Sequence, residues 1–359
     1  MFFKLMNTFS VPVCLKIGNG ILYSELLATG AIKKTDRVML IIDKIVDKLY
    51  GEELYGFLSQ NCREIKREFV KQGSLREALL MAYYIVNKDF NVVVAMGGGK
   101  VLDVGKYAAS MSKRNFVSIP TSISHDGVAS PIAVLKFDGG SVHSLNCKIP
   151  EFILMDLDII KSAPRQLITS GLGDLVSNIT ALKDWKKASD KGKAVMDDFA
   201  YIISGTAVRA IFQYKGSGLT DDRFLTQLAE SIVLSGLAMN ITGNSHPSSG
   251  AEHLISHGID KIGKGISHGI QAAVATLLVE YLYGGDVEAI RSYLKSFDMP
   301  TTFVELGLSF EEYLRVMKIA RSTREGRYTI LDEISLEDDN LTEIYNAVYN
   351  EAEKCSPPR

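Results

Sequence analysis

Three patterns follow one another in the segment Val92-Val93-Val94-Ala95-Met96-Gly97-Gly98-Gly99-Lys100-Val101-Leu102-Asp103-Val104-Gly105-Lys106. An uninterrupted apolar run bounded by turn residues is typical of a parallel strand that is buried on both faces. Three glycines then let the backbone approach a pyrophosphate closely, and the N–H groups at the start of the next helix favour negative charge. The segment therefore predicts a strand, a phosphate-binding turn and a helix. A plain structural turn is the alternative, because the spacing is neither G-x-G-x-x-G nor G-x-x-x-x-G-K-[ST].

Similar patterns extend in both directions from this segment. Apolar runs recur at 38–42, 115–119 and 152–155, and helix-like stretches cover 75–86 and 101–112. Strands that alternate with helices imply right-handed crossovers and a doubly wound, mostly parallel sheet. The turn signal Asp138-Gly139-Gly140 instead predicts a hairpin within 132–149.

Helical periodicity dominates after Pro164, with long candidate helices at 197–213 and 221–240. We therefore predict an α/β fold with two domains: a nucleotide-binding α/β domain over 1–164 and an all-helical domain over 165–359. The default position for a ligand in such an arrangement is the cleft between the domains.

The composition excludes several classes of protein. The 359 residues include 40 Lys and Arg against 42 Asp and Glu, which gives a net charge of −2 and no cationic field for nucleic acid. The apolar stretch 272–283 is too short to span a membrane and contains Glu280. The N-terminus lacks the pattern of a secretory signal, and four scattered cysteines fit a reducing compartment. We expect a cytoplasmic protein without a membrane span.

Polar residues follow two of the predicted strands. Asp43 comes directly after the strand at 38–42, where a carboxylate can accept hydrogen bonds from an adenosine ribose and favour NAD over NADP. A loop aspartate that caps the next helix is the more common outcome. The polar run Thr121-Ser122-Ile123-Ser124-His125-Asp126 follows the strand at 115–119 and is either part of the binding crevice or an ordinary loop.

Four of the six histidines lie between residues 246 and 268. His253 and His257 are four residues apart and would share one helix face, and His268 begins another apolar helix. Together with Asp174, two histidines and an open coordination position describe a catalytic divalent metal, with zinc as the default. Ordinary surface or core histidines are the alternative. The residues between His253 and His257 include no glutamate, which disfavours a metalloprotease.

Several strings together resemble the superfamily of glycerol dehydrogenases, metal-dependent alcohol dehydrogenases and dehydroquinate synthases, and within it the glycerol-1-phosphate dehydrogenases. The resemblance spans residues 38–331. The strings are the glycine segment 97–106, Pro120-Thr121-Ser122, His125-Asp126-Gly127-Val128-Ala129-Ser130-Pro131, Gly171-Leu172-Gly173-Asp174 with Asp184-Trp185, Ser249-Gly250-Ala251-Glu252-His253-Leu254-Ile255-Ser256-His257, His268-Gly269-Ile270-Gln271 and Arg327-Tyr328-Thr329-Ile330-Leu331.

This resemblance implies a role for individual residues. Metal ligands would be Asp174, His253 and His268, and substrate contacts would be Asp126, Asp174 and His257. Cofactor contacts would be Asp43, Gly98, Gly99, Lys100, Asp103, Thr121, Ser122, Ser124 and Ser130. Asn178 stands where some members of the superfamily carry a fourth ligand, a histidine, which fits the three-ligand zinc enzymes better than the iron alcohol dehydrogenases.

The resemblance also implies an activity. We expect a metal-dependent oxidoreductase that reversibly reduces dihydroxyacetone phosphate to glycerol 1-phosphate with NAD(P)H, in phospholipid biosynthesis, as a homo-oligomer that acts on a small molecule. A glycerol or polyol dehydrogenase using NAD is the runner-up. A dehydroquinate-synthase-type cyclase and a non-enzymatic binding protein are weaker alternatives. One departure bears on the choice: His246 stands where the family usually has an arginine that could contact the substrate phosphate.

Overall fold

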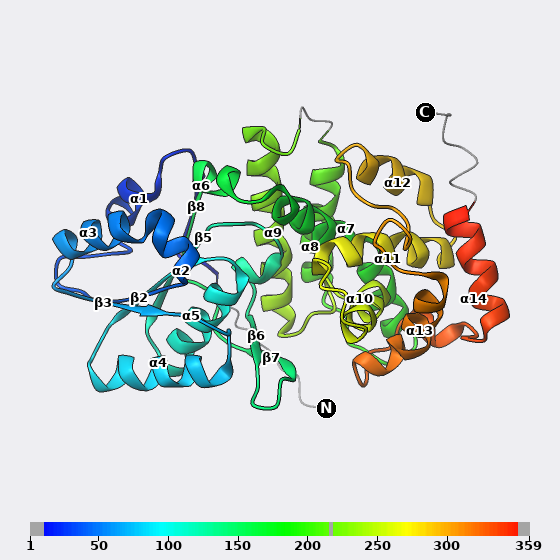
Figure 1. Cartoon of the computed structure of the whole chain (residues 1–359), viewed down its shortest axis with the longest axis horizontal. Coiled ribbons are helices and arrows are strands. Elements are labelled where there is room, and N and C mark those ends of the chain that lie inside the picture. The colour runs from blue at the N-terminus through cyan, green and yellow to red at the C-terminus, as the bar shows by residue number, and fades with distance from the viewer. Residues whose placement is uncertain (1–10, 215–217, 351–359) are drawn as a thin grey trace. The chain divides into compact units, whose positions relative to one another are not determined.

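The computed structural model describes residues 11–214 and 218–350 (Figure 1). The chain forms two compact units, which we describe one at a time. The first contains the residues up to Ile168 together with Thr220–Gly243, and the second contains Thr169–Leu219 together with the residues from Asn244 onward. The sequence predicted one division near residue 164. The structure differs because a helix from the second half of the chain packs with the first unit.

A six-stranded parallel sheet forms the centre of the first unit, in the order β1-β8-β5-β4-β2-β3. Its strands are β1 (Cys14–Gly18), β2 (Arg37–Ile42), β3 (Glu64–Phe69), β4 (Val92–Gly97), β5 (Asn115–Pro120) and β8 (Phe152–Asp156). All six residues of β4 are buried, as expected for a strand between two others and beneath helices on both faces. The predicted doubly wound sheet is confirmed.

Helices cover both faces of this sheet, as Figure 1 shows, with α4 and α5 on one face and α1 and α3 on the other. The helices of the first unit are α1 (Leu22–Ala28), α2 (Lys44–Val46), the π-helical turn η1 (Asp47–Gly51), α3 (Glu52–Asn61), α4 (Leu75–Asn87), α5 (Gly99–Ser112), the 3₁₀ turn η2 (Asp126–Val128), α6 (Leu157–Ser162) and α9 (Asp222–Thr242). A Cβ atom at Gly105 would lie 2.6 Å from the Ala95 Cβ, so this glycine lets α5 pack tightly on β4.

The register of the sheet brings several predicted residues to one edge. Gly97 of β4 pairs with Pro120 of β5, and Ile42 of β2 pairs with Met96 of β4. The chain moves outward to β3 after β2, and in the other direction to β5 and β8 after β4. The glycine turn therefore follows a strand at the point where the strand order reverses, which is the usual ligand-binding position in such a sheet.

The predicted hairpin is confirmed as β6 (Ile132–Lys136) paired antiparallel with β7 (Val142–Asn146). A buried lysine of α5 holds the start of this hairpin and the loop before it. The Lys106 ammonium donates to the carbonyl oxygens of Gly127, Ser130 and Ile132 at 2.7, 3.1 and 2.6 Å, and it lies 3.3 Å from an Asp103 carboxylate oxygen. One side chain on α5 thus holds the loop that carries Asp126.

Helix α9 packs on the same loop. A Cβ atom at Gly236 would lie 2.8 Å from the carbonyl carbon of Ala129, so the helix and the loop backbone are in close contact. Asp221 caps the helix by accepting from the N–H groups of Arg223 and Phe224. By length and composition α9 could cross a membrane, but 67% of its apolar window is buried, as in the core helix of a globular protein.

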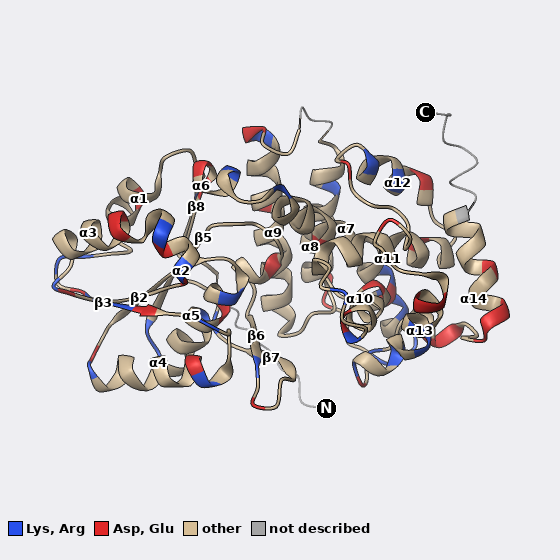
Figure 2. Ribbon diagram, in the orientation of Figure 1, with Lys and Arg blue, Asp and Glu red and all other residues tan. Residues whose placement is uncertain are grey.

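The second unit is helical in the residues that the structure describes. Its elements are α7 (Arg165–Asp190), α8 (Asp198–Phe212), α10 (Ala251–Lys261), α11 (His268–Leu282), α12 (Val287–Lys295), α13 (Phe310–Ala320), η3 (Arg321–Thr323), η4 (Ile330–Glu333), α14 (Asp338–Tyr345) and η5 (Asn346–Asn350). Ser309 begins α13 with a capping box that includes Glu312. Figure 2 shows acidic and basic residues interspersed along the elements of each unit.

Candidate active site

Three helices of the second unit bring Asp174, His253 and His268 together. Asp174 is on α7, His253 on α10 and His268 begins α11. The Nε2 atoms of His253 and His268 lie 3.4 and 3.9 Å from the same Asp174 carboxylate oxygen. One potential ligand atom from each residue lies within 4.8 Å of the other two. Residues separated by almost a hundred positions therefore converge as the metal hypothesis requires.

Two glycines allow α7 and α11 to approach so closely. A Cβ atom at Gly269 would lie 1.8 Å from the Ser170 carbonyl oxygen, and one at Gly173 would lie 2.2 Å from the Gly269 carbonyl oxygen. Each glycine is next to a residue of the triad, because Gly173 precedes Asp174 and Gly269 follows His268. The helices thus cross where the carboxylate and one imidazole must meet.

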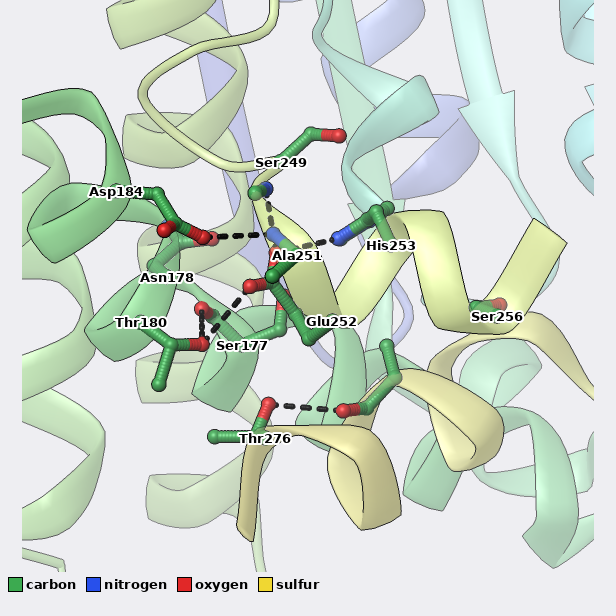
Figure 3. Close-up of polar contacts among 12 residues, drawn as sticks. Ser177, Asn178, Thr180, Asp184, Ser249, Ala251, Glu252, His253, Ser256 and Thr276 are labelled. Carbon is green, nitrogen blue, oxygen red and sulfur yellow. Dashed lines mark hydrogen bonds and ion pairs between the residues drawn. The ribbon is translucent and has the colours of Figure 1, made fainter. Parts of the chain in front are cut away.

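A buried carboxylate orients His253 (Figure 3). The His253 Nδ1 atom lies 2.9 Å from the Glu252 Oε1 atom, and Glu252 also accepts from the Thr180 hydroxyl at 2.9 Å and from the Gly250 N–H at 2.6 Å. A carboxylate can only accept, so Nδ1 donates a proton to Glu252, and Nε2 is the nitrogen that faces Asp174. This is the usual way in which proteins prepare a histidine for a metal.

A second chain of hydrogen bonds does the same for His268. The Ser256 hydroxyl donates to Gln271 Oε1 at 2.6 Å, and it lies 2.9 Å from His268 Nδ1. Because the hydroxyl proton is used on Gln271, the Ser256 oxygen accepts from the imidazole. Gln271 is fixed in turn by donation to Asp260 at 2.9 Å. The Nε2 atom of His268 is therefore the nitrogen that faces Asp174.

The electrostatic environment favours a cation at the triad. Burial lowers the pKa of His253, but hydrogen bonds to Asp174 and Glu252 outweigh it and raise this pKa to about 9. One carboxylate oxygen and two imidazole nitrogens form a donor set that suits a catalytic divalent metal. The residues present therefore fit the metal that the sequence predicted.

His257 lies beside the triad, with its ring centroid 5.8 Å from that of His268 and 6.4 Å from that of His253. Burial and then the charges of His268 and His253 lower the pKa of His257 to about 3, which keeps it neutral. Asn178, one turn after Asp174, donates to the Ser204 hydroxyl at 3.1 Å and is fully buried. Its amide is part of the packing of α7 against α8.

The glycine turn in the first unit has the form that phosphate binding needs. Gly98 is the N-cap of α5 and supplies no side-chain cap, so the first-turn N–H groups of the helix are not covered by a cap side chain. Thr121 and Ser122 are buried, and the Thr121 N–H donates to the Gly97 carbonyl oxygen at 3.0 Å. The loop after β5 thus lies along the turn.

His125 is a neighbour of this turn that the sequence analysis did not select. A Cβ atom at Gly99 would lie 2.1 Å from the His125 Nε2 atom, so the imidazole occupies the space that this glycine leaves. The Gly127 N–H donates to His125 Nδ1 at 2.9 Å, which leaves the ring proton on Nε2. His125 belongs to one of the strings that resemble the family, but the sequence does not indicate that its side chain lies against the glycine turn.

The other predicted cofactor residues have different surroundings. Asp43 caps α2 by accepting from the N–H groups of Ile45 and Val46 at 2.8 and 2.9 Å through one oxygen. Asp103 is buried, accepts from the Val134 N–H at 3.1 Å and faces Lys106. Lys100 is exposed and Ser124 is partly exposed.

Two residues of the loop 126–130 are held from different sides. The Ser130 side chain is buried, with its hydroxyl 3.4 Å from the Ile132 carbonyl oxygen. The Ser235 hydroxyl of α9 donates to the Asp126 carboxylate at 3.3 Å. The structure thus explains how these two side chains are positioned, while their contacts with cofactor and substrate stay predictions.

Comparisons with known proteins agree with this arrangement. A family model described as iron-containing alcohol dehydrogenase matches residues 17–164. A glycerol-1-phosphate dehydrogenase [NAD(P)+] of Archaeoglobus fulgidus is 35% identical over 87% of this chain and 93% of its own length. One from Hyperthermus butylicus is 33% identical over 92% of this chain and 95% of its own length.

A solved structure has a similar fold. Glycerol dehydrogenase from Schizosaccharomyces pombe superposes with a TM-score of 0.79 at 20% identity, covering 97% of this chain and 91% of that protein.

Proposed function

This chain belongs to the family of glycerol-1-phosphate dehydrogenases, and from that premise we propose that it reversibly reduces dihydroxyacetone phosphate to glycerol 1-phosphate with NAD(P)H. The observation that carries the proposal is the convergence of Asp174, His253 and His268, with each imidazole oriented by its own hydrogen-bond chain. Such a site is suited to a carbonyl group, because a divalent metal, when bound, polarises it as a Lewis acid.

The reaction moves a hydride from the nicotinamide to the central carbonyl carbon and a proton to its oxygen, with the redox chemistry supplied by the cofactor. Residues of this chain would align the two reactants. His257, which is half-buried and neutral, would accept a hydrogen bond from a substrate hydroxyl. Asp126, held by Ser235, is proposed as a second substrate contact.

We propose zinc as the metal, since two imidazoles and one carboxylate leave an open position that is typical of catalytic zinc sites. The cofactor would contact Asp43, Gly98, Gly99, Lys100, Asp103, Thr121, Ser122, Ser124 and Ser130. The uncapped start of α5 supports a pyrophosphate position there. Asp103 would act chiefly by supporting the loop after β5, because its carboxylate is already used by Val134 and Lys106.

Asp43 provides a test of cofactor choice. One carboxylate oxygen caps α2, which leaves the other for a ribose hydroxyl. Asp43→Asn keeps a side-chain acceptor for the cap but removes the charge that would repel a 2′-phosphate. We expect the ratio of kcat/KM for NADH to that for NADPH to fall about tenfold, measured by initial rates. The same ratio in Asp43→Asn and the wild type would remove Asp43 from the cofactor site.

We further propose a cytoplasmic homo-oligomer. Cys14, Cys62 and Cys147 are free thiols, which fits a reducing compartment. Helix α4 exposes Leu80, Tyr83 and Val86, an apolar surface that self-association would cover. Sedimentation velocity would measure the oligomeric state directly.

The function itself is tested by NADH and NADPH oxidation with dihydroxyacetone phosphate and, in parallel, with dihydroxyacetone, in enzyme supplied with zinc. We expect kcat/KM to be higher for the phosphate ester, and chiral analysis of the product would identify glycerol 1-phosphate. A clear preference for dihydroxyacetone would instead support the runner-up, a glycerol dehydrogenase.

A further inference from the structure

The position at which the family usually has an arginine, His246, does not supply a positive charge. Burial, and then the charges of Arg327 and Arg324, lower the pKa of His246 to about 3. Its ring instead stacks on Trp185, with the centroids 6.2 Å apart and the planes 15° from parallel. If this enzyme binds a phosphate ester, the compensating charge must come from other residues.

Two arginines converge beside His246. Arg324 and Arg327 both donate to the hydroxyl oxygen of Ser245, at 2.7 and 2.9 Å. Arg327 also donates to the Ser249 carbonyl oxygen at 2.8 Å, which fixes it at the start of α10. Both guanidinium groups are partly buried, and in the residues that the structure describes neither forms an ion pair with a carboxylate.

The shared Ser245 hydroxyl places two positive charges side by side. Like charges held on one neutral hydroxyl repel each other, and partial burial reduces the water that could screen them. The effect is visible in Arg327, whose pKa falls to about 9 through burial and then through the charge of Arg324. An anion between the two groups would relieve this repulsion, and arginine's planar guanidinium matches phosphate oxygens in pairs.

The pair lies next to the metal triad. Thr323, which precedes Arg324, has its hydroxyl 3.2 Å from the Leu254 carbonyl oxygen, in the turn of α10 between His253 and His257. The charge of Arg324 also contributes, after burial and the neighbouring histidines, to the low pKa of His257. Both arginines therefore border the part of α10 that carries a metal ligand and a proposed substrate contact.

We propose that Arg324 and Arg327 form the binding site for the phosphate group of the substrate, with Ser245 holding the two guanidinium groups together in the free enzyme. This inference rests on the proposed function and names the residues that would distinguish a phosphorylated substrate from a free polyol. Arg324 and Arg327 would supply the positive charge that His246 does not.

The test compares Arg324→Gln, Arg324→Lys and the control Arg315→Gln, in enzyme supplied with zinc. Arg315 is on α13 of the same unit and is 65% exposed.

A charge-assisted hydrogen bond to phosphate is expected to change affinity about ten- to hundredfold. In Arg324→Gln, the ratio of kcat/KM for dihydroxyacetone phosphate to that for dihydroxyacetone should therefore fall at least about tenfold, mainly through KM. For Arg324→Lys we expect a ratio between those of Arg324→Gln and the wild type, because lysine keeps the positive charge but lacks the planar guanidinium group. Arg315→Gln should behave as the wild type.

A binding measurement separates this inference from the proposed function. Inorganic phosphate should raise the Tm of the wild type and of Arg315→Gln, but not that of Arg324→Gln, at an ionic strength matched with sodium chloride. If the wild type and Arg324→Gln show the same phosphate-dependent Tm and the same substrate ratio, the arginine site is wrong, even where dihydroxyacetone phosphate proves to be the substrate. If the wild type prefers dihydroxyacetone, the proposed function fails, and a phosphate-dependent Tm that requires Arg324 would still establish an anion site. Should Arg324→Gln fail to fold, Arg324→Lys and Arg327→Lys provide the same comparisons.

Discussion

His253→Ala is expected to abolish metal retention and to lower kcat by about a thousandfold or more. A Lewis acid contributes several kcal/mol of transition-state stabilisation, and each 1.4 kcal/mol is about tenfold in rate. The substitution removes one of two imidazole donors, and it leaves the buried Glu252 carboxylate without the imidazole N–H that it now accepts. Mass spectrometry of bound metal after dialysis, together with NADH oxidation, measures both effects.

His143→Ala is the matched control for this experiment. His143 is exposed on the hairpin strand β7 of the other unit, so its loss should change neither metal content nor turnover. His268→Ala should reproduce the effect of His253→Ala. Normal turnover of purified His253→Ala after treatment with a chelator would refute the metal site.

Gly269→Ala is expected to destabilise the protein by about 3 kcal/mol or more and to reduce metal binding as well. The new Cβ would lie 1.8 Å from the Ser170 carbonyl oxygen, 2.7 Å from the Ser170 carbonyl carbon and 3.0 Å from the Asp174 backbone nitrogen. These are backbone atoms, so no side chain can move aside, and α7 and α11 must separate. Separation would also move His268 away from Asp174. Thermal unfolding should show a Tm that is lower by roughly 5–10 °C.

Gly56→Ala provides the comparison for this substitution. Gly56 lies within α3, and a Cβ atom there would have no neighbour within 4 Å. Alanine in the interior of a helix is favoured over glycine by about 0.5–1 kcal/mol, so this variant should be as stable as the wild type or slightly more stable. A Tm of Gly269→Ala equal to that of the wild type would mean that the close crossing of α7 and α11 is not required.

The central strands could be predicted from sequence because they are apolar throughout. β4, for example, reads Val-Val-Val-Ala-Met-Gly and is buried on both faces. β1 and β3 were not predicted. β3 reads Glu-Ile-Lys-Arg-Glu-Phe and lies at the edge of the sheet, where charged side chains can reach water, so it carries no continuous apolar signal.

The candidate site shows a similar division. His253, His268 and Asp174 could be proposed because few residue types bind metals and their strings are distinctive. The hydrogen-bond chain through Ser256 and Gln271 could not be predicted, since these are common residues whose partners depend on how α10 packs against α11. Likewise, nothing in the sequence between Ser245 and Arg327 indicates that they meet across 82 positions.

Helix α9 limits where the chain can be cut into fragments that fold on their own. Its residues lie between two segments of the second unit, yet they pack on the loop 126–130 of the first. A fragment that stops at residue 168 would lose the Ser235 hydroxyl that donates to Asp126, and it would expose the loop backbone that Gly236 contacts. Isolation of the first unit would therefore require residues 220–243 to be joined to it, through an artificial linker or by circular permutation. Evolution by simple fusion of two independent halves does not account for this interleaved order.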